Sequence, residues 1–296
     1  MPLFRFCAIL RDMYGPEIIV RTLSNRLSEP DRWGNLWQYH SRSDHHSKIA
    51  CWALLFDLLN VCPTLAEHAR KGKIGYGINH QMRDFAQNRK KDLDLVICSP
   101  RTNETPKPGL SFKELVERYD IDLSQEDKKV LGGLPDIALT PVGSVYIAVE
   151  AKACMTEHIK ALPRLYDELN SSQLTIHGAA DQAIAIGFVL VNSADEFLSP
   201  GNNKFDMKLT SAKVNAHRQP LCTERVIGKV GELPRRSRTG GDGFDAIGIT
   251  VVKLRNDGGR VSVTITAPAP QPGDNLHYSQ MIDRAKQLYS SRFPQL

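Results

Sequence analysis

The chain has 296 residues, of which 41% are hydrophobic and 24% charged, as in an ordinary globular protein with one large domain. Its longest apolar runs are too short to span a bilayer, and the N-terminal MPLFRFCAILRDMYG lacks the features of a signal peptide, so we expect a cytoplasmic protein. The six cysteines are scattered without a C-x-x-C pair, which disfavours a disulfide framework or a zinc site. The formal net charge of +5 is compatible with a polyanionic partner but does not require one.

The first strong element is a long apolar stretch, DHHSKIACWALLFDLLNVCP, at residues 44–63. It predicts a helix with Asp44 or Ser47 as the N-cap and Pro63 as the stop. Because the helix is apolar nearly all round, we expect it to be buried against a sheet. DLDLVICSP, residues 92–100, follows as a predicted strand. The polar residues 101–132 are expected to form an excursion from the core.

The second half of the chain alternates strands and helices. GLPDIALTPVGSVYIAVEAKA, residues 133–153, predicts two strands joined by a tight turn. We then expect a helix over 156–172, a strand buried on both faces over 183–194, a hairpin around 256–259 and a last helix over 277–293. This order predicts an α/β fold with a mixed central β-sheet flanked by helices, in one domain spanning residues 1–296.

Charged residues end the second strand of the predicted hairpin. Glu150 and Lys152 share one face under the two-residue period of a strand, and the opposite face is apolar. A short hairpin would bring Asp136, at the start of the preceding strand, close to Glu150. Two neighbouring carboxylates resist ionisation unless a cation offsets them, and Mg²⁺ prefers oxygen ligands. With the Lys152 amine able to orient or deprotonate a water, the pattern indicates metal-assisted phosphodiester hydrolysis.

These residues resemble a known motif. Pro135-Asp136, thirteen intervening residues and Glu150-Ala151-Lys152 resemble the PD-(D/E)xK motif of the restriction-endonuclease-like nuclease superfamily. The resemblance implies that Asp136 and Glu150 bind Mg²⁺ together with the backbone carbonyl of Ala151. It also implies that Lys152 lies beside the attacking water.

The resemblance extends to the predicted fold. The order helix, three strands, helix, strand over residues 44–192 resembles the core of that superfamily, with N- and C-terminal elaborations. A stand-alone chain of this length resembles a type II restriction endonuclease. That implies a homodimer that cuts double-stranded DNA, with residues 193–296 serving specificity and dimerisation. Two alternatives stay open: a structure-selective or repair nuclease of the same fold, and a DNA-binding or assembly protein without catalysis.

A rival first carboxylate precedes the hairpin. Asp94 lies near the start of an apolar strand and follows a basic run. In a different sheet arrangement it would contribute to the metal site with Asp136 at its side. Alternatively, Asp94 forms a salt bridge with Lys90 or Lys91.

Clustered basic residues are candidate DNA contacts. They precede the strand at residue 92, follow Lys152 on a predicted helix, and occur in the loop PRRSRTGGDG. Arginine suits phosphates and guanine edges, although such clusters also occur as solvated surface charge. The candidates are Lys90, Lys91, Lys160, Arg164, Arg235, Arg236 and Arg238.

Overall fold

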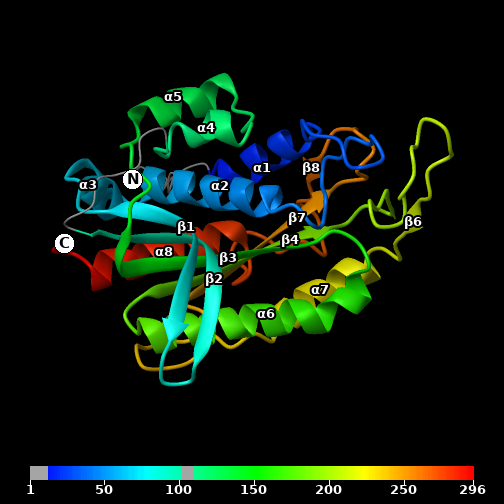
Figure 1. The fold of residues 1–296 in the computed structure, drawn as a ribbon. Coiled ribbons are helices and arrows are strands. Elements are labelled where there is room, and N and C mark those ends of the chain that lie inside the picture. The colour runs from blue at the N-terminus through cyan, green and yellow to red at the C-terminus, as the bar shows by residue number, and fades with distance from the viewer. Residues whose placement is uncertain (1–12, 102–109) are drawn as a thin grey trace, which may run out of the picture.

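A mixed six-stranded β-sheet forms the centre of the computed structural model, which describes residues 13–101 and 110–296 (Figure 1). Its strands are β1 (Gly75–Asp84), β2 (Arg89–Pro100), β3 (Val142–Cys154), β4 (Ile184–Asn192), β7 (Ala246–Lys253) and β8 (Ser262–Val263). They lie in the order β1-β2-β3-β4-β7-β8. β1, β2 and β3 are antiparallel neighbours, β3, β4 and β7 are parallel, and β8 is antiparallel to β7. The predicted α/β class with a mixed, helix-flanked sheet is confirmed.

Helices pack on both faces of this sheet. They are α1 (Gly15–Leu23), α2 (His45–Val61), α3 (Pro63–Arg70), α4 (Leu115–Arg118), α5 (Gln125–Gly133), α6 (His158–Ala179), α7 (Leu221–Gly231) and α8 (Tyr278–Arg292). α1, α2 and α8 contribute to the hydrophobic cluster on one face, and α6 and α7 to the cluster on the other. α4 and α5 form an outer layer beyond α2 (Figure 1). A separate short pair, β5 (Glu196–Phe197) and β6 (Asn215–Ala216), lies outside the main sheet.

The predicted helix over 44–63 is α2, and it is buried almost all round. Its apolar character is explained by its neighbours, because it lies between the sheet, α1, α8 and the segment that carries α4. The Trp52 indole, for example, donates a 2.9 Å hydrogen bond to the carbonyl of Phe112. α2 ends at Val61, and α3 begins at Pro63 after a bend of 98°. No single helix in the described residues is long and apolar enough to span a membrane, and only this bent pair has the length and composition for it.

Residues 134–141 do not form the strand that the sequence predicts. They run along the edge of β1, where Leu139 makes an isolated parallel bridge to Tyr76. Gly75 permits this close approach, because a Cβ there would lie 2.1 Å from the Thr140 side chain. β3 instead pairs with β2 on one side and β4 on the other. The prediction of a hairpin that brings Asp136 beside β3 is therefore wrong. The antiparallel neighbour of β3 is β2, and the edge strand next to β2 is β1, which the sequence did not predict.

Other predicted elements agree with the structure more closely. β4 is buried at all nine positions, as expected for a strand covered on both faces. The helix expected over 156–172 is α6, which begins at His158 and continues to Ala179. α8 matches the helix expected over 277–293. The N-terminal stretch considered for a signal peptide lies, up to residue 12, outside the described residues.

The chain after residue 192 continues the main sheet. β7 pairs in parallel with β4, and the predicted hairpin joins β7 to β8. Asn256 lies at this turn with φ 64°, and its side-chain nitrogen donates to the carbonyls of Tyr39 and Leu198 at 2.9 and 2.8 Å. The C-terminal part is thus fastened both to the sheet and to the loop before α2.

Candidate functional site

The candidate site lies where β2 and β3 separate. Their antiparallel pairing ends at Leu95 and Val149. Beyond this point β3 continues beside β4, whereas β2 continues with β1 alone. We call this point of separation the fork. Here the Asp94 side chain replaces the backbone pairing of β2 with β3, because its Oδ2 accepts a 2.8 Å hydrogen bond from the backbone N–H of Ala151. Because the N–H and C=O of one residue in an extended strand point to the same side, the Ala151 carbonyl also faces the fork.

Glu150 and Lys152 lie next to this fork as the sequence predicts. The Glu150 side chain is only 1% exposed, and its Oε1 is 2.7 Å from the Lys152 Nζ. Its second oxygen, Oε2, is buried without a hydrogen-bond partner. A buried, unpartnered carboxylate oxygen is costly, so this atom marks a position where a further cation or donor would be stabilising.

Glu168 is a site residue that the sequence analysis missed. It lies on α6, and its Oε2 is 3.3 Å from the Lys152 Nζ, while its Oε1 pairs with Arg164 at 2.6 Å. Strand β2 contacts the same residue, because Lys91 Nζ donates a hydrogen bond to the Glu168 carbonyl at 3.4 Å. The available signal was the position of Glu168 on α6, four residues after Arg164.

The charges at the fork are unbalanced. Burial raises the pKa of Asp94 and of Glu150 above their ordinary values, although Lys152 acts on both carboxyls in the opposite direction. Burial alone would lower the pKa of Lys152, but Glu150, with Asp94 and Glu168, raises it. The amine is therefore held as an ammonium ion, yet the pKa values of Asp94 and Glu150 remain above their ordinary values. A divalent cation beside these two carboxyls would stabilise their ionised forms further.

The start of α2 also reaches the site. The Ser47 hydroxyl is among the groups that lower the pKa of Asp94. Burial, with a smaller contribution from Lys152, lowers the pKa of His46 to about 4, so its ring is neutral near pH 7. Asp44 pairs with Lys48 at 2.8 Å and contributes to the negative charge around Asp94. From the sequence, Asp44 and Ser47 are candidate helix N-caps, and Asp44 and Asp57 are the acids of this helix available as a further metal ligand.

Asp57, deeper in α2, is not part of the fork. Its carboxylate accepts hydrogen bonds from the backbone N–H groups of Tyr14 and Gly15 at 3.0 and 2.8 Å, and from the Tyr278 hydroxyl at 3.0 Å. It therefore fastens α1 and α8 to α2.

Asp136, the first-choice metal ligand from the sequence, is not brought to the fork. It is exposed, and its Oδ1 accepts a 3.1 Å hydrogen bond from the backbone N–H of Lys113. The next residues follow the outer edge of β1 at Tyr76, so β1 and β2 lie between them and β3. The strand adjacent to Glu150 carries Asp94 instead, so the rival carboxylate occupies the place predicted for Asp136.

Arg236 corrects a second prediction, because it is buried rather than available to DNA. Its Nε lies 3.0 Å from Asp245, its Nη1 lies 3.4 Å from Asp181, and its Nη2 donates to the Ala183 carbonyl at 2.7 Å. Arg236 is a structural residue that fastens its loop to the starts of β4 and β7.

The remaining candidate DNA contacts differ in their setting. Lys160 is exposed and paired with Glu157 at 2.6 Å, and the exposed Arg164 is paired with Glu168. Lys90 is exposed on β2, and the partly buried Lys91 donates its hydrogen bond to the Glu168 carbonyl of α6. The structure also leaves two loop residues exposed, Arg235 and Arg238.

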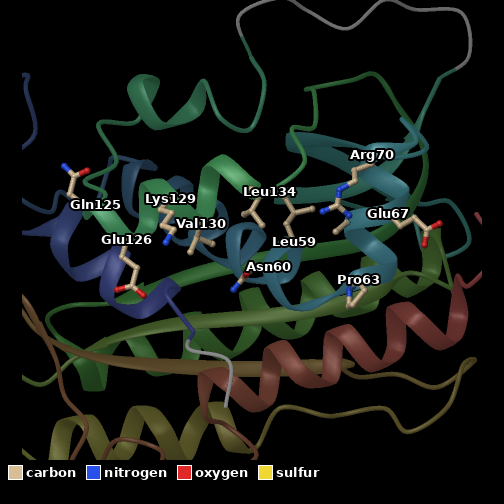
Figure 2. Close-up of a pocket in the computed structure, with 12 residues that line it drawn as sticks. Leu59, Asn60, Pro63, Glu67, Arg70, Gln125, Glu126, Lys129, Val130 and Leu134 are labelled. Carbon is tan, nitrogen blue, oxygen red and sulfur yellow. The ribbon is translucent and has the colours of Figure 1, made fainter. Parts of the chain in front are cut away.

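A separate pocket of about 1080 Å³ opens between the α2–α3 corner and α5 (Figure 2). Figure 2 shows Glu67 and Arg70 at one end and Glu126 and Lys129 at the other. Its described lining includes none of the charged residues of the fork. The full set is Leu59, Asn60, Pro63, Ala66, Glu67, Arg70, Gln125, Glu126, Lys129, Val130, Gly133 and Leu134.

No protein-family model, curated protein or solved structure matches this chain. Within residues 13–101 and 110–296, no group of three or more His, Cys, Asp or Glu side chains is arranged to hold a metal ion. The fork offers two carboxylates and a backbone carbonyl. Mg²⁺ commonly binds through one or two carboxylates, retains several waters and takes further oxygens from substrate phosphates. The unpartnered Glu150 Oε2 fits such a cation.

Proposed function

We propose that this protein is a Mg²⁺-dependent DNA endonuclease of the PD-(D/E)xK type, in which Asp94 is the first carboxylate. The observation that carries the proposal is the fork itself. It has Asp94 on the strand next to Glu150, with the Ala151 N–H bonded to Asp94 and Glu150 Oε2 unpartnered. A solvated Glu–Lys pair on a strand surface would not be buried or share its amine with a second acid.

Each residue of the fork has a role in this proposal. Asp94, Glu150 and the Ala151 carbonyl would hold the metal ion. When bound, Mg²⁺ would polarise a phosphoryl oxygen and make a bound water more acidic. Lys152 supplies a fixed positive charge that orients the attacking water and offsets the charge of the phosphate. Glu168 holds the Lys152 amine from the α6 side.

The substrate in this proposal is double-stranded DNA. Its finer form is a type II restriction endonuclease that acts as a cytoplasmic homodimer. The net charge of +5 and the exposed basic residues Lys90, Arg235 and Arg238 support a DNA substrate. The alternative of a repair nuclease differs in its products, which the experiment below separates.

The decisive experiment compares two aspartates. Purified protein is incubated with long duplex DNA and Mg²⁺, and the products are separated on a gel. We expect Asp94→Asn and Lys152→Ala to abolish cleavage, and Asp136→Asn to cleave like the wild type. Discrete bands indicate restriction, whereas a smear or cutting confined to junctions indicates repair. Wild-type protein that leaves DNA intact with both Mg²⁺ and Mn²⁺ would refute the nuclease proposal, and an active Asp94→Asn variant would refute the site assignment.

A further inference from the structure

Beyond the fork, β1 and β2 form a two-stranded antiparallel ribbon, which we define as residues 79–94. The pairing runs from His80 with Leu93 to Asp84 with Arg89, and within this stretch β2 has no partner on its other side. In Figure 1 the ribbon extends from the sheet across α6, with its turn beyond that helix. A free-standing ribbon is at best marginally stable, so its support must come from packing.

One face of the ribbon supplies that packing. Met82 and Leu93 are buried in the same cluster as Leu169 of α6. At the far end of α6, a Cβ on Gly178 would lie 2.3 Å from the carboxyl group of Asp84, so the helix and ribbon are in close contact. The ribbon is therefore held firmly against α6.

The other face of the ribbon is exposed and carries like charges next to the turn, followed by Asp92, whose Oδ1 accepts a 3.0 Å hydrogen bond from Gln81. Arg83 and Lys90 lie directly opposite each other in the register, and both are exposed. Like charges at directly paired positions destabilise a two-stranded ladder. Arg83 donates a 3.3 Å hydrogen bond to the neutral side chain of Asn88. The end of this face next to the turn is therefore basic and complementary to a polyanion.

The tip of the ribbon carries an aromatic ring. Phe85 is 78% exposed, and it is the only aromatic residue among the strongly exposed large hydrophobic residues of the described chain. The Arg83 guanidinium lies over its ring, 4.9 Å from the centroid. An exposed ring beside cations is suited to contacts with the sugars and bases of a nucleic acid.

We propose that the ribbon enters a groove of duplex DNA, with Arg83 and Lys90 contacting phosphates and Phe85 contacting the DNA at the tip. The inference rests on the proposed function, since the same duplex would pass the fork. The major groove is wide enough for a two-stranded β-ribbon. The ribbon begins at Asp94 and touches Glu168 through Lys91, so DNA held by the ribbon lies beside the candidate site.

The test measures binding apart from cleavage. A fluorescent duplex is titrated in EDTA at several salt concentrations, and its anisotropy is recorded. The double variant Arg83→Gln with Lys90→Gln should weaken binding about tenfold and reduce the salt slope by about 1 to 2. Phe85→Ala should weaken binding roughly fivefold or more with an unchanged salt slope.

A matched control removes the same charge elsewhere. Lys128 and Lys129 are exposed neighbours on α5, in the outer layer beyond α2 (Figure 1). Lys128→Gln with Lys129→Gln should leave both affinity and salt slope unchanged. Thermal unfolding checks that all variants remain folded.

Three outcomes would contradict the inference in different ways. Wild-type binding that the ribbon variants match refutes the ribbon contact alone. Ribbon substitutions that weaken only single-stranded DNA binding refute insertion into a duplex groove. Wild-type protein that neither binds nor cuts duplex DNA refutes the proposed function and the ribbon contact together.

Discussion

Two of the buried clusters of charged side chains in the described residues differ in how their charges balance. At the starts of β4 and β7, Asp245 is fully buried and receives Arg236 at 3.0 Å and Arg292 at 2.6 Å. Its other oxygen accepts the Ala185 N–H at 2.9 Å. At the fork, Glu150 is almost equally buried but has one amine, shared with other acids, and one unpartnered oxygen.

The two carboxyls respond in opposite directions. Burial alone would raise the pKa of Asp245, but Arg236 and Arg292 lower it below its ordinary value. Burial raises the pKa of Glu150, and Lys152 does not fully offset the effect. A buried charge in a structural role needs partners of opposite charge for all of its polar atoms. Buried ionisable groups whose pKa values are perturbed because their pairing is incomplete are typical of functional sites. The comparison separates a structural cluster from a candidate catalytic one.

The largest expected effect is on cleavage at the unbalanced cluster. Glu150→Gln keeps the size of the side chain but removes its charge, so cleavage should fall by at least about 10³-fold, because a metal ligand acts on the transition state. Initial cleavage rates under excess enzyme provide the measurement. A Glu150→Gln variant whose cleavage rate is within about tenfold of the wild-type rate would show that Glu150 is not a metal ligand in catalysis.

The next effect is on stability at the balanced cluster. Asp245→Asn leaves Arg236 and Arg292 without their carboxylate, so the free energy of unfolding should fall by about 3–5 kcal/mol. Chemical denaturation is the measurement, with Glu150→Gln as the matched control, which should change stability by less than about 1 kcal/mol. Similar losses in both variants would remove the distinction between the clusters.

A smaller effect links stability to metal. Lys152→Ala removes the amine from Glu150, and because Lys152 is partly exposed we expect a cost of about 2 kcal/mol. Mg²⁺ should restore more stability to this variant than it adds to the wild type, since it supplies the missing positive charge. Thermal unfolding with and without Mg²⁺ tests this. Arg236→Met serves as the control and should show no added response to Mg²⁺.

The smallest effect is a pH dependence of the balanced cluster. Because the folded pKa of Asp245 is below its ordinary 3.8, ionised Asp245 stabilises the protein above that pH, and this contribution is lost as the pH falls through the folded value. The stability difference between wild type and Asp245→Asn should therefore shrink by about 1.4 kcal/mol per unit of pKa lowering. Urea unfolding from pH 6 downward measures it. A difference that grows on acidification would contradict the assignment.

The sequence predicted elements better than it predicted their pairing. The alternation and length of β2, β3 and β4 were sufficient to identify them, and α2 was defined by its apolar run and Pro63. The segment at 134–141 is apolar and close in sequence to β3, so a local hairpin was the expected arrangement. The actual partner of the Ala151 N–H is Asp94, 57 residues away, and no local pattern encodes a contact at that separation.

The charged residues show the same limit. Glu150 and Lys152 were found because a strand's period places them on one face. Glu168 was missed because a helical acid looks like a solvated residue until the helix is placed over the sheet. Arg236 was assigned to DNA because its loop is rich in arginine, although its partner Asp245 follows nine residues later, at the start of a strand.

The fork also divides the candidate site between two mechanical parts. Asp94 belongs to the ribbon strand β2, whereas Glu150 and Lys152 belong to a strand held between β2 and β4 within the sheet. Any ligand that shifts the ribbon therefore changes the spacing of the two acids. DNA on the ribbon and metal at the fork would then alter each other's affinity by the same factor, as thermodynamic linkage requires. In such an arrangement, DNA binding at the ribbon would control how tightly the fork binds its metal ion.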